Sequence, residues 1–352
     1  MAMDMHQLLQ VTIERNASDL HMVANTYPAY RIDGQLYQMA TFPLLTRELM
    51  QSLVLSILTN EQKENLIANK EIDFGYEMNG SRFRGNIYHT RGSLSASFRY
   101  IPQEIHTVDQ LMLPKSISEI GNFNNGLVLV TGPTGEGKST TLASIINKIN
   151  QTTASHIITI EDPIEYVYPH AKSIISQREL HEDTHSWNIA LRSVLREDPD
   201  VVLVGEIRDY ESAALVLTIA ETGHLVFSTL HTTSTPETIN RIIDMFPAHQ
   251  QNQVKSQLAA VLRAVVAQRL LPRADLRGRV PAVELLYNTP AVSAIIREGK
   301  PFLLDNVLQT SEGEGFIYFE RYLAQLHAQG FISPETAKSF SIRPKDLEKY
   351  LK

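Results

Sequence analysis

The chain has 352 residues, which at roughly 150 residues per domain suggests two domains, and its 43% hydrophobic and 20% charged residues are typical of a globular protein. A net charge of −7 argues against a basic surface that would hold nucleic acid or an anionic membrane through charge alone. The absence of cysteine excludes disulfides, thiol catalysis and cysteine-bound metal centres. The sequence has no signal-peptide pattern, and its apolar runs are far shorter than the ~18 residues that a membrane-spanning helix needs. It therefore predicts a cytoplasmic protein with no membrane span.

The N-terminal part of the sequence, residues 1 to about 112, predicts a small domain that mixes helix and strand. Apolar residues recur at helical spacing over 46–58, so a helix is expected there. Two alternating segments, 81–88 and 94–100, predict strands, and Arg91-Gly92 between them predicts a hairpin turn.

The remainder of the sequence, residues 113–352, predicts an α/β domain. Pro102 and Leu113-Pro114 interrupt the earlier pattern, and beyond them apolar runs alternate with amphipathic ones. This succession predicts a mostly parallel sheet with helices on both faces. The expected strands are 127–130, 157–160, 201–204 and 225–230, and the expected helices begin at 138 or cover 187–196 and 212–221. From about residue 236 the spacing of apolar residues predicts a helical C-terminal part.

A phosphate-binding loop is predicted between the first of these strands and the first of these helices. Its residues match G-x-x-x-x-G-K-[ST], in which glycines let backbone N–H groups curl around a phosphate at a helix N-terminus. The Lys138 ammonium would reach the β- and γ-phosphates, and the Ser139 hydroxyl would ligate magnesium. The expected binding residues are Gly132, Pro133, Thr134, Gly135, Glu136, Gly137, Lys138, Ser139 and Thr140. The sequence therefore predicts binding of ATP and Mg²⁺.

One residue of this loop, Glu136, is unusual for a site that holds a polyanion. Its carboxylate would repel the phosphate groups if it faced them. We therefore expect the side chain to point away from the phosphates, toward another subunit.

Three further strands of the α/β pattern end in residues suited to phosphoryl transfer, which needs a carboxylate to orient water and positive charge near the transferred group. One strand is followed by Glu206, while Gly205 takes the place where P-loop enzymes usually carry an aspartate. Another strand ends with Glu161, and a third is followed by His231. Ligands lie at the carboxyl ends of strands in such sheets, so Glu161 and Glu206 are expected near the loop. His231 could bond to the γ-phosphate, although a polar residue is also ordinary at a strand end.

Arginines of the N-terminal domain form a second group of candidates. In the expected strand 81–88, Phe83 and Ile87 face one side, so that neighbouring arginines face the other. In a ring of subunits, such arginines can reach the nucleotide of a neighbouring subunit. The candidates are Arg84, Arg91 and Arg99.

The succession of these motifs resembles the type II/IV secretion ATPase superfamily. In that family the matching segments are the phosphate loop, an aspartate box, an atypical second nucleotide-binding strand and a histidine box. Here the resemblance is carried by five stretches of sequence: Gly132-Pro-Thr-Gly-Glu-Gly-Lys-Ser-Thr-Thr141, Ile160-Glu-Asp-Pro-Ile-Glu165, Leu191-Arg-Ser-Val-Leu-Arg-Glu-Asp-Pro-Asp200, Gly205-Glu-Ile-Arg-Asp209 and residues 223–233. The segments that resemble the family's second N-terminal domain are Ala17-Ser-Asp-Leu-His21, Arg31-Ile-Asp-Gly34 and Phe98-Arg-Tyr-Ile-Pro102.

The resemblance implies a homo-hexamer built from a PAS-like domain over 1–112 and a RecA-like ATPase domain over 113–352. It implies that Glu206 is the catalytic carboxylate, that Glu161 supports the metal or the water, and that His231 senses phosphate. Arginine fingers are implied to come from among Arg84, Arg91 and Arg99. Within the superfamily the sequence is most similar to ATPases that retract type IV pili, which implies a motor for twitching motility that acts through an inner-membrane platform protein.

Other functions share parts of this pattern. An ATPase of a conjugation or type IVB secretion system would carry the same catalytic residues. A regulatory subunit that binds nucleotide without hydrolysing it is disfavoured by the presence of Lys138, Glu206 and His231, and a helicase is disfavoured by the net charge of −7. The segment 291–298 matches only the end of the family's retraction motif. The length leaves no room for the extra N-terminal domain of assembly ATPases, and the lack of cysteine excludes their four-cysteine zinc site. Both features favour the retraction branch.

Overall fold

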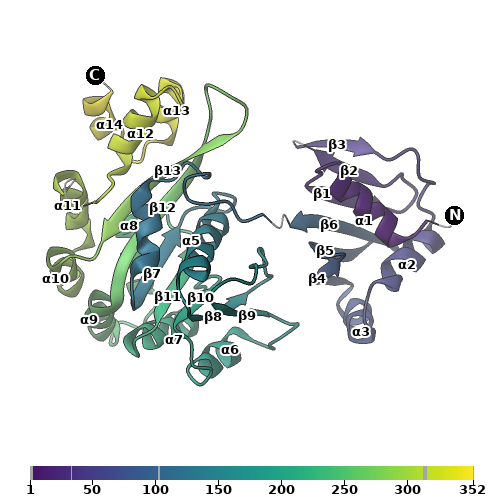
Figure 1. Cartoon of the computed structure of the whole chain (residues 1–352), viewed down its shortest axis with the longest axis horizontal. Coiled ribbons are helices and arrows are strands. Elements are labelled where there is room, and N and C mark those ends of the chain that lie inside the picture. Colours follow the sequence, from purple (N-terminus) through teal and green to yellow (C-terminus); the bar gives the residue numbers. More distant parts are fainter. Residues whose placement is uncertain (1–2, 33, 102–103, 312–314, 352) are drawn as a thin grey trace. The chain divides into compact units, whose positions relative to one another are not determined.

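The computed structural model describes residues 3–32, 34–101, 104–311 and 315–351. Asp33 and Pro102, which belong to patterns used above, lie outside the described residues. The chain divides into two compact units, drawn in Figure 1. The first comprises Met1–Glu104 with Pro163–Val167, and the second comprises Ile105–Asp162 with Tyr168–Lys352.

The first unit contains, within its described residues, a six-stranded antiparallel sheet in the order β3-β2-β1-β6-β5-β4. Helices α1 (Met5–Glu14), α2 (Arg47–Ser56) and α3 (Asn60–Asn69) accompany it. The strands are β1 (Asp19–Val23), β2 (Ala29–Ile32), β3 (Gln35–Gln38), β4 (Glu71–Met78), β5 (Ser81–Thr90) and β6 (Ser93–Ile101).

The predicted helix and hairpin of this unit are confirmed. The Thr46 side chain accepts a hydrogen bond from the backbone N–H of Leu49, which caps α2 at its start. Arg91 and Gly92 have φ angles of 49° and 74°, as a two-residue hairpin turn requires, and they join β5 to β6. Phe83 on β5 is fully buried, and with it Ile87, while Arg84 between them is exposed.

The second unit contains, in the part of the chain that is described, a seven-stranded sheet in the order β13-β12-β7-β11-β10-β8-β9. All neighbouring pairs are parallel except β12 with β13, which confirms the mostly parallel sheet. The strands are β7 (Gly126–Thr131), β8 (His156–Glu161), β9 (Ile174–Glu179), β10 (Val201–Val204), β11 (Leu225–Leu230), β12 (Leu262–Pro272) and β13 (Arg279–Tyr287).

Helices of the second unit pack on this sheet and against one another. Alternate residues of β7, Leu127 and Leu129, share one core cluster with residues of α6, α7, α8 and α9, whereas α5 packs on β7 and β11 outside that cluster. The helices are α4 (Lys115–Glu119), α5 (Lys138–Thr152), α6 (Trp187–Val194), α7 (Tyr210–Glu221), α8 (Thr235–Asp244), α9 (Gln251–Val261), α10 (Pro290–Glu298), α11 (Leu304–Thr310), α12 (Phe319–Ala328), α13 (Pro334–Phe340) and α14 (Pro344–Tyr350). Two short 3-10 helices are η1 (Ile120–Asn122) and η2 (Pro301–Leu303).

The prediction that the chain is helical from about residue 236 is wrong for β12 and β13. Helix α9 ends at Val261, and β12 begins at Leu262 between β7 and β13. The run 264–267 is buried throughout. A strand covered on both faces and both edges has a continuous apolar run rather than an alternating one, and such a run cannot be told from a buried helix by periodicity. The sequence also did not predict the edge strand β9. Most side chains of this strand are half-buried.

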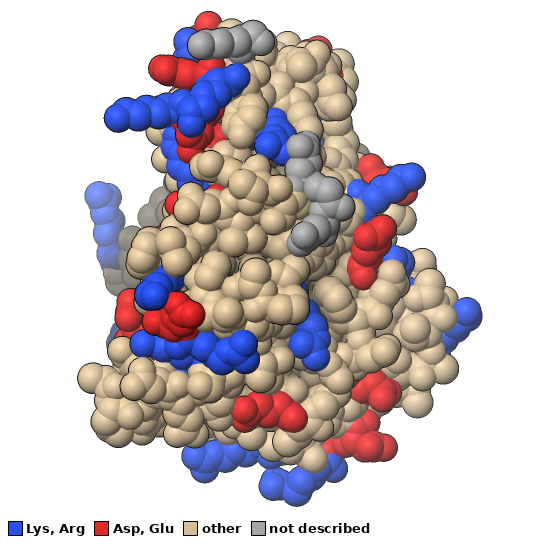
Figure 2. Space-filling view, turned by 90° about the vertical axis from the view of Figure 1, so that its left-hand side faces the viewer, with Lys and Arg blue, Asp and Glu red and all other residues tan. Residues whose placement is uncertain are grey.

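The outer surface of the structure carries charges of both signs. On the face in Figure 2, Lys and Arg side chains are interspersed with Asp and Glu. Within the described ranges, no helix combines the length and the apolar character needed to cross a membrane.

We expect Gly85→Ala to destabilise the first unit by about 1–3 kcal/mol through overpacking. A Cβ at Gly85 would lie 2.7 Å from ring atoms of Phe74 and 3.0 Å from the ring of Phe98, both of which are buried. Thermal unfolding followed by circular dichroism measures the loss as a lower Tm. Gly121→Ala is the control, because its Cβ would meet Ile149 at an ordinary 3.4 Å. An unchanged Tm for Gly85→Ala would contradict the packing described here.

Candidate nucleotide site

Four parallel strands of the larger sheet end side by side. Leu230 of β11 lies beside Thr131, the last residue of β7, and Val204, the last residue of β10, lies beside Ile160 of β8. Because parallel strands point the same way, the residues at their carboxyl ends meet at one edge of the sheet. The residues placed at this edge are Gly132, Glu161, Glu206 and His231.

The start of the phosphate loop approaches β12 so closely that it requires glycine. Gly132 has a φ of 146°, and a Cβ there would lie 2.3 Å from the carbonyl oxygen of Gln268. Gly137, which precedes α5, has a φ of 75°, and its Cβ would lie 3.1 Å from Nε2 of Gln268. A side chain at either position would be strained by the backbone and by this contact.

Gln268 of β12 holds both the loop and the helix that follows it. Its buried side chain donates from Nε2 to the carbonyl oxygen of Glu136 at 2.7 Å and accepts at Oε1 from the Thr141 hydroxyl at 2.7 Å. On β13, Arg279 donates to the carbonyl oxygen of Gly135 at 3.2 Å. Sequence reasoning missed Gln268, because it lies in a segment predicted to be helical and no motif connects it to the loop.

The Lys138 side chain folds back over its own loop. Its Nζ donates to the carbonyl oxygens of Gly132 at 2.6 Å and Pro133 at 2.9 Å, and the residue is buried. Ser139 and Thr140 are half-buried in the first turn of α5, and the exposed tip of the loop consists of Thr134 and Gly135. The ammonium of Lys138 is thus held by carbonyl oxygens at the start of the loop.

The Glu136 side chain bonds within its own chain, not toward another subunit as the sequence predicted. Its Oε2 accepts the backbone N–H of Leu270 on β12. This N–H belongs to the part of β12 that extends beyond its pairing with β7, which ends at Ala267. Glu136 therefore replaces a missing strand partner and anchors the loop to β12.

A cavity of about 390 Å³ opens beside the loop, within the second unit. This volume falls in the range of roughly 300–1,000 Å³ typical of small-molecule sites. Its lining combines the loop and α5 with β12, β13 and the segment that precedes α4. The lining includes Leu111, Met112, Gly137, Thr140, Leu270 and Arg273.

The Glu206 carboxylate is held between two donors. It accepts from Nε of Arg208 and pairs with Nε2 of His231 at 3.0 Å, and Arg208 also pairs with Asp162 at 3.2 Å. Partial burial raises the pKa of Glu206, but the hydrogen bonds and charges of Arg208 and His231 outweigh this effect and hold the pKa below its usual value. The carboxylate is therefore ionised at neutral pH and fixed in orientation.

The Glu161 carboxylate lies at the same edge and is buried. Its Oε1 accepts from the Thr159 hydroxyl at 2.7 Å and from Nε2 of Gln177 on β9 at 3.4 Å. These donors fix the carboxylate between its own strand and β9.

Trp187 occupies the space beside the strand-end glycine. A Cβ on Gly205 would lie 3.3 Å from Cη2 of Trp187 and 3.4 Å from the carbonyl oxygen of Ile160. The buried indole Nε1 has no hydrogen-bond partner among the described residues. The indole thus takes the room that an aspartate side chain would need, which gives a physical reason for glycine at this position.

The arginine candidates belong to the first unit, where two of them lie side by side and the third lies apart. Arg84 of β5 and Arg99 of β6 are opposite each other across the strand pair, and Arg99 also pairs with Asp19 at 2.9 Å. Arg91 lies in the hairpin turn, seven residues along β5 from Arg84, which at about 3.3 Å per residue is roughly 23 Å away. Arg84 and Arg99 thus form one cationic pair, and Arg91 is a separate group.

The residues expected to hold magnesium, Ser139 and Glu161, come from α5 and β8. Among the residues that the structure describes, no three His, Asp or Glu side chains gather into a metal site. A hydroxyl and a carboxylate suit Mg²⁺ that is bound with a nucleotide, because this ion keeps several waters and takes other ligands from phosphate oxygens. The donor set therefore fits magnesium that arrives with its nucleotide.

Comparison with known proteins places the chain in a family. Residues 1–300 match the model of the type II/IV secretion system proteins, so the chain belongs to that family. Its sequence is 41% identical to the type IV pilus retraction ATPase PilT of Pseudomonas aeruginosa, over 98% of this chain and 100% of that protein. It is 44% identical to a twitching motility protein of Neisseria gonorrhoeae, over 94% of this chain and 88% of the relative.

The fold is also that of a solved relative. The crystal structure of the pilus retraction motor PilT with bound ADP superposes with a TM-score of 0.93, at 45% identity and with 99% of each chain covered. This likeness confirms the α/β fold, with its mixed sheets, over 99% of the chain.

Glu136→Gln is expected to change ADP affinity by less than about threefold, whereas Glu136→Ala weakens it by about tenfold. The amide can still accept the N–H of Leu270, while the methyl group cannot, so only the second variant frees the loop from β12. Titration with a fluorescent ADP analogue measures both. If Glu136→Gln bound more than about tenfold tighter, the carboxylate would be facing the phosphates after all.

Gly205→Asp is expected to displace the indole of Trp187, because the added side chain meets the ring. Trp187 is the single tryptophan of the sequence, so its emission should shift to longer wavelength and acrylamide should quench it more strongly. Gly205→Ala serves as the graded control and should give a smaller change, since a lone methyl group needs only a few tenths of an ångström. Identical spectra for wild type and Gly205→Asp would count against this contact.

Proposed function

We propose that this chain is an ATP-hydrolysing motor that drives the retraction of type IV pili. The observation that carries the proposal is the phosphate loop with its lysine, set at the sheet edge that also bears Glu206 and His231. The chain is similar over almost its whole length to a pilus retraction ATPase and to a solved retraction motor with bound ADP. This similarity supports both nucleotide binding and a function in pilus retraction.

Each group at the edge has a role in the proposed reaction. The Lys138 ammonium exchanges the loop carbonyl oxygens for oxygens of the β- and γ-phosphates, while the nucleoside enters the cavity beside Gly137. The ionised Glu206 accepts a hydrogen bond from the attacking water and orients it toward the γ-phosphate. His231 bonds to Glu206 before the nucleotide arrives, and it donates from Nε2 to the γ-phosphate once the nucleotide is bound. Ser139, with support from Glu161, would hold magnesium, which would supply positive charge to the phosphate oxygens.

The two units receive different roles in this proposal. Residues 113–352 act as the RecA-like ATPase domain, and residues 1–112 act as the PAS-like domain. In a homo-hexamer, Arg84 and Arg99 act as a pair that adds positive charge to a neighbour's nucleotide, and Arg91 acts as a separate contact.

The proposed setting follows from the similarity to pilus motors. The motor works in the cytoplasm and is held at the inner membrane by a platform protein of the pilus machine. The relatives named above for twitching motility and pilus retraction support this assignment.

Steady-state ATP hydrolysis by wild type, Lys138→Ala and Glu206→Gln tests the proposal. Glu206→Gln should lose at least about 100-fold in kcat, because the amide orients water poorly, yet should still bind ATP. Lys138→Ala should lose ATP binding, because the charge on the phosphates is no longer balanced. Should wild type turn over ATP no faster than Glu206→Gln while binding it equally well, the motor function would be excluded.

A further inference from the structure

Glu284 of β13 is a charged group that the reaction above does not use, although it is completely buried. Its Oε2 pairs with Nη1 of Arg343 at 2.9 Å. Its Oε1 accepts both the backbone N–H of Thr235 at 2.9 Å and the hydroxyl of that residue at 3.0 Å. A carboxylate in this position must keep such partners, because a buried charge without them is strongly unfavourable.

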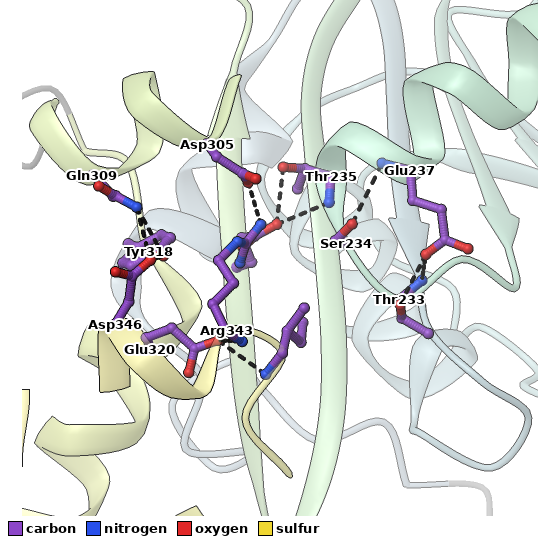
Figure 3. A network of polar contacts seen from close by, with 12 residues as sticks. Thr233, Ser234, Thr235, Glu237, Asp305, Gln309, Tyr318, Glu320, Arg343 and Asp346 are labelled. Atoms are coloured by element: carbon purple, nitrogen blue, oxygen red, sulfur yellow. Dashed lines mark hydrogen bonds and ion pairs between the residues drawn. The ribbon is translucent and has the colours of Figure 1, made fainter. Parts of the chain in front are cut away.

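On one side, this carboxylate is connected to the nucleotide site through the first turn of α8. Thr235 begins that helix, four residues after His231. Between them, Thr233 donates from its N–H and from its hydroxyl to Glu237, each at 2.8 Å. Figure 3 shows Thr233, Glu237 and Thr235 on this side of the network. A short stretch of backbone that bonds to the start of α8 thus joins His231 to Thr235, which bonds to Glu284.

A second link joins the same turn to the strand that delivers the phosphate loop. The Thr238 hydroxyl bonds to that of Thr232 at 2.7 Å and to that of Thr131 at 3.3 Å, and Thr131 directly precedes Gly132. Thr131 also lies beside Ala267 of β12, which lies beside Glu284 of β13. One row across three strands thus contains both the residue that precedes the loop and the buried carboxylate.

On the other side, Arg343 is fixed by the C-terminal helices. Its Nη2 pairs with Asp305 of α11, and its guanidinium lies 5.2 Å from the centroid of the Tyr318 ring. Its backbone N–H donates to Glu320 of α12, which is also completely buried. In Figure 3, Asp305, Tyr318 and Glu320 surround Arg343 on the side away from Thr233. The guanidinium therefore cannot follow α8 without moving α11 and α12.

We propose that Arg343 is a positioning residue for ATP hydrolysis: through Glu284 it holds the turn after His231, and it thereby couples the nucleotide site to helices α11–α14. This inference rests on the proposed function, because ATP hydrolysis is the reaction that Arg343 affects. A change at the γ-phosphate that shifts His231 is transmitted through Thr235, Glu284 and Arg343 to the C-terminal helices. Conversely, a partner that moves those helices changes the placement of His231.

Kinetics of Arg343→Gln provide the first test. The variant should lower kcat for ATP by about fivefold or more, the lower end of ordinary coupling between sites. KM should stay within about threefold, because the phosphate loop keeps its own anchors. Lys349→Gln is the matched control, since it removes an exposed cation and an ion pair from α14 but leaves Glu284 and Arg343 paired. Arg343→Lys should restore part of the rate. Wild-type kcat in a folded Arg343→Gln protein would overturn the proposal.

A variant with both partners replaced covers the case in which Arg343→Gln fails to fold. Glu284→Gln combined with Arg343→Met removes both charges and keeps much of the packing, a change that buried ion pairs often tolerate. The double variant should fold with a lowered kcat. Wild-type kcat in this folded protein would equally overturn the proposal.

Hydrogen exchange measured with and without a non-hydrolysable ATP analogue separates this proposal from the proposed function, because the analogue carries a γ-phosphate and requires no hydrolysis. In wild type, the analogue should change amide exchange over 304–310 and 319–350, and the change should be absent in Arg343→Gln but present in Lys349→Gln. An equal change in wild type and Arg343→Gln would exclude the coupling. A coupled response in a wild type that does not hydrolyse ATP would overturn only the motor function.

Discussion

A methyl group on residue 132 would lie 2.3 Å from the carbonyl oxygen of Gln268, so the phosphate loop begins in contact with β12. The other hydrogen bonds that hold the loop depend on this short distance between the loop and β12. Only at such a separation can the Gln268 side chain reach both Glu136 and Thr141, and only there can Glu136 reach the N–H of Leu270. The nucleotide site is therefore shaped by a strand that lies 132 residues away in sequence.

The strands on the loop side of this contact could be predicted from the sequence, whereas β12 on the other side could not. The strands β7, β8, β10 and β11 were predictable, because short apolar runs alternate with amphipathic helices and end in recognisable motifs. β12 was not, because a strand buried on all sides has no alternation, and its run 264–267 continues the spacing of α9. The positions of Glu161, Glu206 and His231 at one edge follow from parallel strands alone.

The contacts that orient those residues were beyond sequence reasoning. Nothing local to Glu136 indicates that its carboxylate accepts from Leu270, since that N–H is available only because β7 ends before β12 does. The same holds for Trp187, whose ring explains the glycine at 205. Charge alone suggested that Glu136 avoids the phosphates, but its partner is a backbone group of the same chain.

Lys138 already donates to the carbonyl oxygens of Gly132 and Pro133, so its ammonium is paired before any phosphate arrives. Nucleotide binding is then an exchange of hydrogen bonds rather than an addition of new ones, and most of the net gain must come from replacing a dipole by a full negative charge. The side chain is also ordered in advance, so little conformational entropy remains to be lost when the ligand enters. A loop arranged in this way is preorganised for polyphosphates and gains little from neutral ligands of the same shape.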